Sequence, residues 1–188
     1  MRHLRKGRVL GRSPSHRKAL FRNLASAIFL TERDTTELEA NAPKVPGRII
    51  TTLEKAKEIR PIVERCITIA CKGIEAEAGA VQYATKAERG TEEWKSWRKS
   101  DAWRQWCDAR SPGVNARRRV LRMLGDKQAV SILFEKVAPR FTDRPGGYTR
   151  ILRLAKPRVG DAGTRAILEF VGKNDRVRKA SSKPSFEG

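Results

Sequence analysis

Apolar residues recur every three to four positions early in the chain, which predicts an amphipathic helix after residue 13. Ser13 and Pro14 begin this helix, because Ser is a favoured N-cap and Pro fits the first helical turn. Residues 32–47 contain two prolines and a glycine and are predicted to form a loop. The expected buried stripe of the helix is Leu20, Leu24, Ala27 and Ile28.

A short β-branched run at residues 48–51 predicts a strand, and a second helix follows it directly. Thr51 and Glu54 have the spacing of a capping box at the start of this helix. Pro61 falls inside its apolar face, so a kink or a break is expected there, and Gly73 is expected to end it. The apolar face comprises Ile59, Ile62, Val63, Cys66, Ile67 and Ala70.

The segment 74–112 contains every tryptophan of the chain and equal numbers of acidic and basic residues. The tryptophans do not share one helical face, which suits a helix packed on two sides or two short helices. Packing is the favoured role, because the segment has no net positive charge. Stacking on nucleic-acid bases and contact with another protein remain alternatives. The four residues are Trp94, Trp97, Trp103 and Trp106.

The second half of the chain predicts two more helices and two strands. Residues 114–124 place apolar residues on one face and arginines on the other, before Gly125 ends the helix. Asp126 caps the next helix, which Pro139 closes.

A turn at residues 143–148 precedes a strand at 149–154, in which basic and apolar residues alternate and the arginines are expected on one side. Residues 165–171 form the matching strand, paired as a hairpin or beside residues 48–51. The pattern predicts one α+β domain over residues 1–171, with several helices packed on a sheet of about three strands. Residues 172–188 are expected to be a disordered basic tail.

Charge is the strongest functional signal, because the chain has 41 Lys and Arg but only 21 Asp and Glu, which gives a net charge of +20. Residues 1–31 hold eight of these cations and no acidic residue, whereas the segments 32–47 and 74–112 add nothing to the excess. In an isolated protein these positive charges repel one another and destabilise the compact state. A partner that supplies negative charge is therefore expected, with nucleic acid first and an anionic membrane second. A merely soluble basic protein is the remaining alternative.

Residues 1–12, the basic arm, combine five Lys or Arg with two glycines and have no periodicity. They are expected to stay disordered until they meet phosphate, although a mitochondrial transit peptide has a similar composition. No run reaches the roughly 18 apolar residues that a membrane span needs. Three cysteines argue against a disulfide framework and fit a reducing compartment.

No arrangement of residues typical of catalysis or metal binding occurs in the sequence. His3 and His16 lie in or beside the basic arm, where contact with phosphate is a simpler role than proton transfer. Cys66 and Cys71 lack the spacing of a zinc site, and Glu64 is interpreted as a solvated helix charge. We therefore expect no enzyme, no metal and no cofactor; an RNA-modifying enzyme would need a cofactor pocket that this sequence does not supply.

Four blocks of the sequence occur together in one order. They are MRHLRKGRVLGRSPSHRKALFRNLASAIFL, RIITTLEKAKEIRPIVERCITIA, NARRRVLRML with DKQAVSILFEKVAPRF, and DRPGGYTRILRL with AILEFV. With these blocks the chain resembles the family of bacterial large-subunit ribosomal protein seventeen. The resemblance covers nearly all of residues 1–31, 48–73 and 114–171. It departs from the family at a longer loop, 32–47, at an inserted helical and Trp-rich segment, 74–112, and at the tail.

The resemblance implies a structural constituent of the large ribosomal subunit in the cytoplasm, bound to its rRNA. It also implies a neighbour in the subunit, large-subunit protein thirty-two, and no small-molecule substrate. A non-ribosomal architectural protein that binds RNA or DNA is the alternative. The residues expected to contact RNA are Arg2, His3, Arg5, Lys6, Arg8, Arg12, His16, Arg17, Lys18, Arg22, Arg117, Arg118, Arg144, Tyr148, Arg150 and Arg153.

Overall fold

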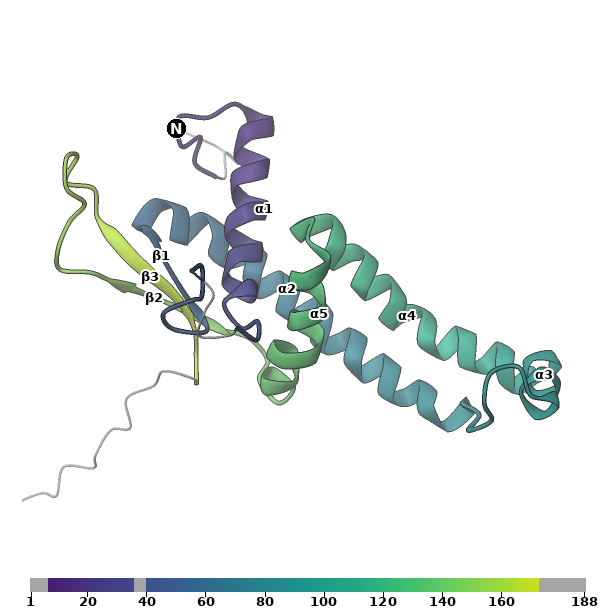
Figure 1. The fold of residues 1–188 in the computed structure, drawn as a ribbon. Coiled ribbons are helices and arrows are strands. Elements are labelled where there is room, and N and C mark those ends of the chain that lie inside the picture. The colour runs from purple at the N-terminus through teal and green to yellow at the C-terminus, as the bar shows by residue number, and fades with distance from the viewer. Residues whose placement is uncertain (1–6, 36–39, 173–188) are drawn as a thin grey trace, which may run out of the picture.

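Five α-helices and a three-stranded sheet make up the part of the chain that the computed structural model describes, residues 7–35 and 40–172 (Figure 1). This is the α+β class expected from the sequence. The helices are α1 (Pro14–Leu30), α2 (Leu53–Ala80), α3 (Glu92–Lys99), α4 (Asp101–Leu124) and α5 (Lys127–Ile132). The strands are β1 (Arg48–Thr52), β2 (Thr149–Arg153) and β3 (Arg165–Phe170).

The sheet is antiparallel with the order β1-β3-β2, so β3 is central and both expected pairings of the last strand are present. Ile49, Leu168 and Ile151 lie opposite one another across the three strands and face the helices. Because side chains alternate along a strand, the next row occupies the other face. That row contains Ile50, which is 56% exposed, and Leu152, which is 43% exposed.

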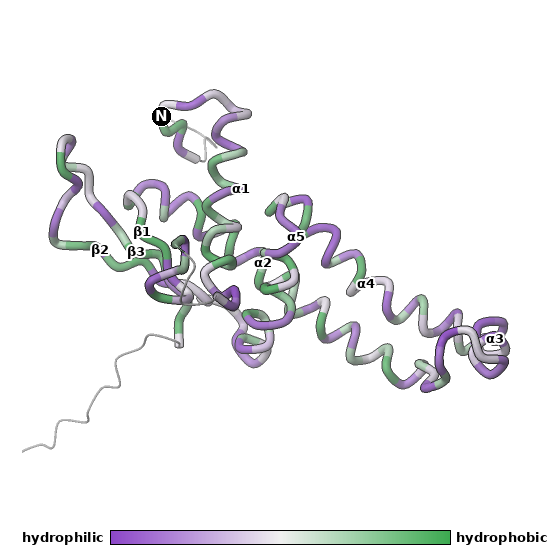
Figure 2. Tube along the Cα trace, viewed as in Figure 1, coloured by the Kyte–Doolittle hydropathy of each residue, from purple (hydrophilic) through white to green (hydrophobic). Residues whose placement is uncertain are grey.

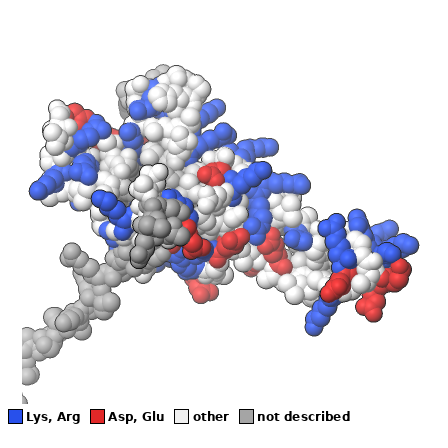
Figure 3. Space-filling model, in the orientation of Figure 1, with Lys and Arg blue, Asp and Glu red and all other residues white. Residues whose placement is uncertain are grey.

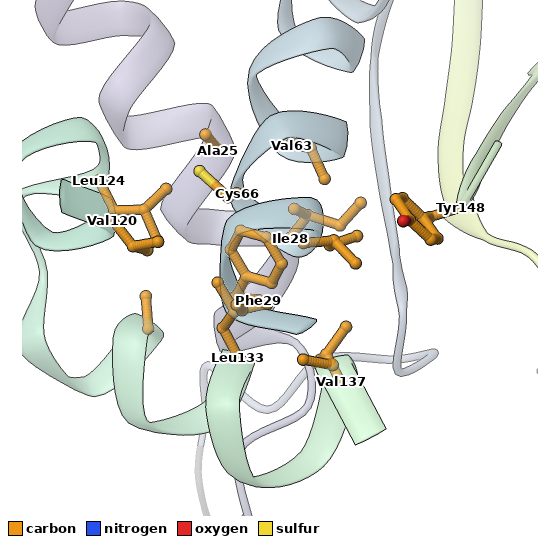
Figure 4. Packing of buried hydrophobic residues seen from close by; sticks show 14 of the residues in the cluster. Ala25, Ile28, Phe29, Val63, Cys66, Val120, Leu124, Leu133, Val137 and Tyr148 are labelled. Carbon is orange, nitrogen blue, oxygen red and sulfur yellow. The ribbon is translucent and has the colours of Figure 1, made fainter. Parts of the chain in front are cut away.

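The core lies where α1, α2, α5, the second half of α4 and the inner face of the sheet meet (Figure 4). Phe29 of α1 and Phe170 of β3 are fully buried, with ring centroids 5.8 Å apart. In α1 the buried stripe is centred on Ala25, Ile28 and Phe29, rotated from the expected Leu20, Leu24 and Ala27, which are only partly buried or half-exposed. Figure 2 shows apolar positions concentrated in this region and hydrophilic positions along much of α3 and α4.

Helix α2 differs from the expectation at both ends. It begins after Thr52, whose side chain makes no capping bond; instead the Leu53 N–H donates to the Thr164 carbonyl at 3.0 Å. It also runs unbroken through Pro61 and past Gly73, so Gly73 is not a helix stop. A Cβ at Gly73 would lie 2.7 Å from the Ala116 Cβ, which shows that the glycine permits close approach of α4.

Helix α4 begins at Asp101, so the expected helix 114–124 is only its second half. Pro112 lies inside α4 and cannot donate a hydrogen bond to the Asp108 carbonyl four residues earlier. The Ser111 hydroxyl donates to that carbonyl at 3.2 Å, which explains how the helix tolerates the proline. Gly125 ends α4 with φ of 76°, as the sequence predicts.

The expected cap of α5 is confirmed, because the Asp126 carboxylate accepts from the Ala129 N–H at 3.1 Å. A π-helical turn at Leu133–Val137 and a 3-10 turn at Ala138–Phe141 continue the chain, so Pro139 falls one turn before the end of the helical segment. The described residues of 32–47 form turns and loop, as expected.

The segment 74–112 extends α2 and α4 as an antiparallel helical pair that projects from the core (Figure 1). A short 3-10 turn, Val81–Tyr83, and α3 lie at its far end. We call residues 81–110 the tip. None of the helices in the described part of the chain is long and apolar enough to cross a membrane.

Candidate nucleic-acid interface

The basic arm folds back over the start of α2 in its described part. Arg8 donates to Glu58 at 2.8 Å, and Arg12 donates to the Leu10 carbonyl at 2.7 Å. Arg8 keeps 45% of its side chain exposed. Four residues expected to bind RNA lie outside the described residues: Arg2, His3, Arg5 and Lys6.

A first cationic hollow, of about 340 Å³, lies between α1, α2 and α4. Lys18 and Arg22, four residues apart on α1, line it together with Arg122 of α4. Arg22 donates to the Arg122 carbonyl at 3.0 Å, which ties the two helices together and holds the Arg22 guanidinium beside Arg122. His16 is exposed and Arg17 is half-exposed on the same helix.

A second cationic hollow, of about 600 Å³, lies between the first half of α2 and strand β2. Lys57, Arg60 and Arg153 line it, and of these only Arg153 was expected from the sequence. Lys57 and Arg60 are three residues apart on one predicted helix, and this spacing could have indicated from the sequence that they share a cationic face. Gly147 also lines this hollow, with φ of 65°.

Glu64, the carboxylate of the second hollow, is not the solvated charge expected from the sequence. It accepts from the backbone N–H groups of Tyr148 and Thr149, at 3.1 and 2.9 Å, and from the Thr149 hydroxyl at 2.6 Å. These bonds join α2 to the turn before β2 and engage both oxygens of the carboxylate.

The arginines of β2 point to opposite faces of the sheet, against the expectation of a single side. The reason is their spacing of three, because side chains alternate along a strand. Arg150 donates to Glu169 at 2.6 Å, and Arg48 contacts the same carboxylate at 3.0 Å from the other side. Glu169 is fully buried, so these two arginines compensate a charge within the fold, while Arg153 faces the hollow beside α2.

Two other residues that were expected to bind RNA have side chains engaged in contacts within the protein. Tyr148 is 3% exposed and packs against Phe141 with centroids 5.2 Å apart, so its ring has almost no surface for RNA. Arg117 binds Glu77 at 3.2 Å and lies over the Phe134 ring at 4.3 Å. By contrast, Arg118 and Arg144 are exposed.

The loop between β2 and β3 is fixed by an ion pair of Arg158 with Asp161. The hydrogen bond from Arg158 holds the pKa of the Asp161 carboxyl well below its ordinary value, and the Gly163 N–H contributes by donating to the same carboxylate. Asp161 lines neither of the two cationic hollows.

Lys and Arg gather along one edge of the molecule, from α1 over α4 to the tip, whereas much of the acidic surface lies on the opposite edge of the helical extension (Figure 3). Among the described residues, no group of three or more His, Cys, Asp or Glu could hold a metal ion. The fold and this surface define a small α+β protein with an extended cationic face, suited to binding a polyanion.

A model of the family described as ribosomal protein L17 matches residues 20–171. The large ribosomal subunit protein bL17 of Rhodopirellula baltica is 68% identical over 187 residues, which cover all of this chain and 89% of that protein. The protein of the same name from Thermus thermophilus is 36% identical over 171 residues, 91% of this chain and 99% of the relative. That from Nitratidesulfovibrio vulgaris is 36% identical over 170 residues, 90% of this chain and 87% of the relative.

The chain therefore belongs to the ribosomal protein L17 family. Family membership places it among ribosomal proteins and not among enzymes. It also makes RNA the polyanion for which the cationic face is suited.

Proposed function

We propose that this chain is a structural constituent of the large ribosomal subunit, in the cytoplasmic ribosome, and that it stabilises folded rRNA by neutralising phosphates. The single observation that supports this most is the cationic edge in a member of the ribosomal protein L17 family. Relatives that match nearly the whole chain are large-subunit proteins by name.

The two cationic hollows supply a rigid surface for RNA. Lys18, Arg22 and Arg122 are carried on packed helices, so little backbone freedom is lost when phosphates bind. Lys57, Arg60 and Arg153 form the second group, beside the turn that Glu64 fixes. Because folded RNA is recognised largely through shape, phosphates and 2′-hydroxyl groups, we expect few base-specific contacts here.

The basic arm adds the adaptable part of the interface. Arg8 pairs with Glu58 on an exposed surface, where such a pair contributes only about 0 to 1 kcal/mol. RNA phosphates can therefore compete for this guanidinium at low cost. Arg2, His3, Arg5, Lys6 and Arg12 complete the proposed contact set of the arm, with His16 and Arg17 at the start of α1.

A protein neighbour, large-subunit protein thirty-two, is proposed to contact the outer face of the sheet. Ile50, Ile167 and Leu152 lie opposite one another on this face, and the two outer members, Ile50 and Leu152, are about half exposed. An exposed apolar row suits a polypeptide better than RNA. Arg48 and Arg150 flank the row, both of them bound to Glu169.

Deleting residues 2–12 tests the role of the basic arm. This deletion removes five Lys or Arg, so we expect weaker binding to rRNA and a flatter dependence of affinity on salt. Each lost phosphate contact lowers the slope by about 0.7 to 0.9. A chain ending at residue 172 is the matched control, since it also loses five Lys or Arg. An unchanged slope on deleting residues 2–12 would remove the arm from the interface.

Sedimentation of a lysate at moderate and high salt tests the function as a whole. Co-migration with the large subunit at about one copy each, surviving a moderate salt wash, supports the proposal. A protein found mainly at the top of the gradient, with large subunits that lack it, would favour an architectural protein acting off the ribosome.

A further inference from the structure

The tip of the helical extension contains an aromatic cluster that the core does not explain. Trp97 packs edge-on against Trp103 and Trp106, with ring centroids 5.0 and 5.7 Å apart. Trp103 and Trp106 stack at 5.1 Å with planes 26° apart. The Trp97 indole N–H donates to the Tyr83 carbonyl at 3.2 Å. These contacts confirm packing of tryptophans between α3 and α4, yet all four indoles remain partly exposed.

Arginines lie near three of the indole rings. The Arg98 guanidinium is 5.1 Å from the centroid of Trp94 and 5.3 Å from that of Trp103. Arg110 lies 4.8 Å from the centroid of Trp106. A guanidinium held against an indole is pre-organised and keeps its N–H donors available at the edges. The tip thus presents aromatic faces and oriented cations at one place.

These side chains surround a hollow of about 460 Å³. Its lining includes all four tryptophans and Arg89, Arg98 and Arg110, and no carboxylate. None of the three arginines has a carboxylate partner among the residues that the structure describes. Two acidic residues of the tip pair with other cations, Glu92 with Lys95 at 2.7 Å and Asp101 with Arg104 at 3.6 Å. The other three, Glu88, Glu93 and Asp108, do not line the hollow. The hollow is therefore complementary to a ligand that is both flat and anionic.

A row of residues on α4 joins this hollow to the cationic surface of the core. Trp106, Arg110, Val114, Arg118 and Arg122 follow one another at steps of four, which places them along one ridge that winds about 40° around the helix axis at each step. Trp106, Arg110, Val114 and Arg118 border a smaller hollow of about 270 Å³, and Arg122 lines the first cationic hollow with Lys18 and Arg22. Figure 3 shows the cations continuing along this edge to the tip.

We propose that the tip is a second RNA-contact site, which holds an unpaired nucleotide of the rRNA. The base lies against the exposed indoles, and Arg89, Arg98 and Arg110 bind its phosphates. Unstacked bases of folded RNA are commonly held on aromatic rings and guanidinium planes, and such stacking tolerates any base. The inference rests on the proposed function, because the same RNA must lie along α4.

Continuity with the cationic surface favours RNA over a polypeptide as the occupant. A phosphate chain that leaves the first hollow meets Arg122, Arg118 and Arg110 in turn before it reaches the indoles. A polypeptide would need acidic side chains along the same path. Binding of a polypeptide is therefore kept as an outcome of the test.

Tryptophan emission, excited selectively over that of tyrosine, reports on the tip alone, because every tryptophan of the chain lies there. The full chain is titrated with a labelled single-stranded RNA of mixed sequence, about eight nucleotides long. The anisotropy of the label measures binding anywhere on the chain, and quenching of the tryptophan emission measures binding at the tip. We expect both signals to change over the same range of concentration.

The double variant Arg98→Gln with Arg110→Gln should weaken the quenching curve by about 10-fold or more, the lower end of what one hydrogen bond to a charged group contributes. The control is Lys95→Gln with Arg104→Gln, which removes two cations from the same tip outside the hollow. This control should stay within about 2-fold of the unmodified chain. Equal weakening of RNA binding in both variants would show that the tip contributes only non-specific positive charge, and this result would overturn the proposed site.

The two signals separate failure of this inference from failure of the proposed function. Anisotropy that rises without quenching would leave RNA binding intact and overturn the site at the tip. Absence of both signals, also with intact rRNA, would overturn RNA binding itself. If tryptophan emission is unchanged by rRNA alone but shifts on assembly with ribosomal proteins, the occupant of the tip is a polypeptide and the nucleotide site is overturned.

Discussion

Replacing Gly73 with Ala tests the contact that positions the helical extension. Gly73 lies on α2 where α4 crosses it, and an added Cβ would stand 2.7 Å from the Ala116 Cβ and 3.2 Å from the Phe134 ring. Real Cβ atoms essentially never approach another atom below 3.0 Å, so α2 and α4 must move apart. Both neighbours are buried, which leaves them little room to adjust.

The expected magnitude combines two opposing effects. Overpacking of a buried contact costs about 1 to 3 kcal/mol. Alanine is favoured over glycine inside a helix by about 0.8 to 1.0 kcal/mol. The net loss in the free energy of unfolding is therefore about 0 to 2 kcal/mol. Gly79→Ala supplies the matched control, because Gly79 lies on the same helix with nothing within 4 Å of its added Cβ.

Urea denaturation followed by far-ultraviolet circular dichroism measures both variants. Gly79→Ala should be stabilised by up to about 1 kcal/mol, so the two variants should differ by about 1 to 3 kcal/mol. Combining Gly73→Ala with Ala116→Gly removes the nearest Cβ, and the pair should be more stable than the sum of the single changes. If Gly73→Ala gains as much stability as Gly79→Ala, the close crossing of α2 and α4 is wrong.

Two further predictions concern the half-buried Glu64 and the buried Cys66. Glu64→Gln should lower the free energy of unfolding by about 1.5 to 3 kcal/mol in the same urea assay, because an amide cannot accept all the bonds that Tyr148 and Thr149 donate to the carboxylate. The control is Glu58→Gln, which changes an exposed pair with Arg8 and should alter the free energy of unfolding by less than about 1 kcal/mol. Cys66 should be the last thiol to react with a thiol reagent at neutral pH, since burial raises its pKa from 9.0 to about 12 and the thiolate is the reactive form. Early alkylation of Cys66 in the folded chain, identified by mass spectrometry, would contradict its burial. The raised pKa also predicts that the stability contributed by the protonated thiol is complete below pH 9 and is lost as the pH rises through 12.

Features determined by neighbouring residues could be predicted from the sequence. The start of α1 at Pro14, the cap of α5 by Asp126 and the glycine that ends α4 all depend on residues within one turn. The three strands were also predicted, because their β-branched and alternating patterns are local. The opposite facing of Arg150 and Arg153 followed from the same alternation, although the sequence interpretation placed them together.

Features determined by distant partners could not be predicted in this way. Gly73 looks like a helix stop until Ala116, on another helix, is seen against it. Glu64 looks solvated until the backbone of Tyr148, 84 residues away, is seen to donate to it. Tyr148 was expected at the RNA surface, but its ring is buried in the core and its hydroxyl lies 3.5 Å from that of Thr68, 80 residues earlier in the chain. Each correction concerns a contact between residues far apart in the chain.

The neutral charge of segment 74–112 has a different meaning once its faces are known. Counted along the chain, seven basic residues balance seven acidic ones, which argued against RNA contact. Yet Glu77, Glu92 and Asp101 each pair with a cation outside the hollow at the tip, whose lining includes three arginines and no carboxylate. Electrostatic interactions are screened over about 8 Å at physiological salt, so a phosphate senses one face of a helix rather than the sum over the segment. Net charge therefore identified the ends of this chain as cationic, but only the pairing of individual side chains reveals that the cationic surface continues through a neutral insertion.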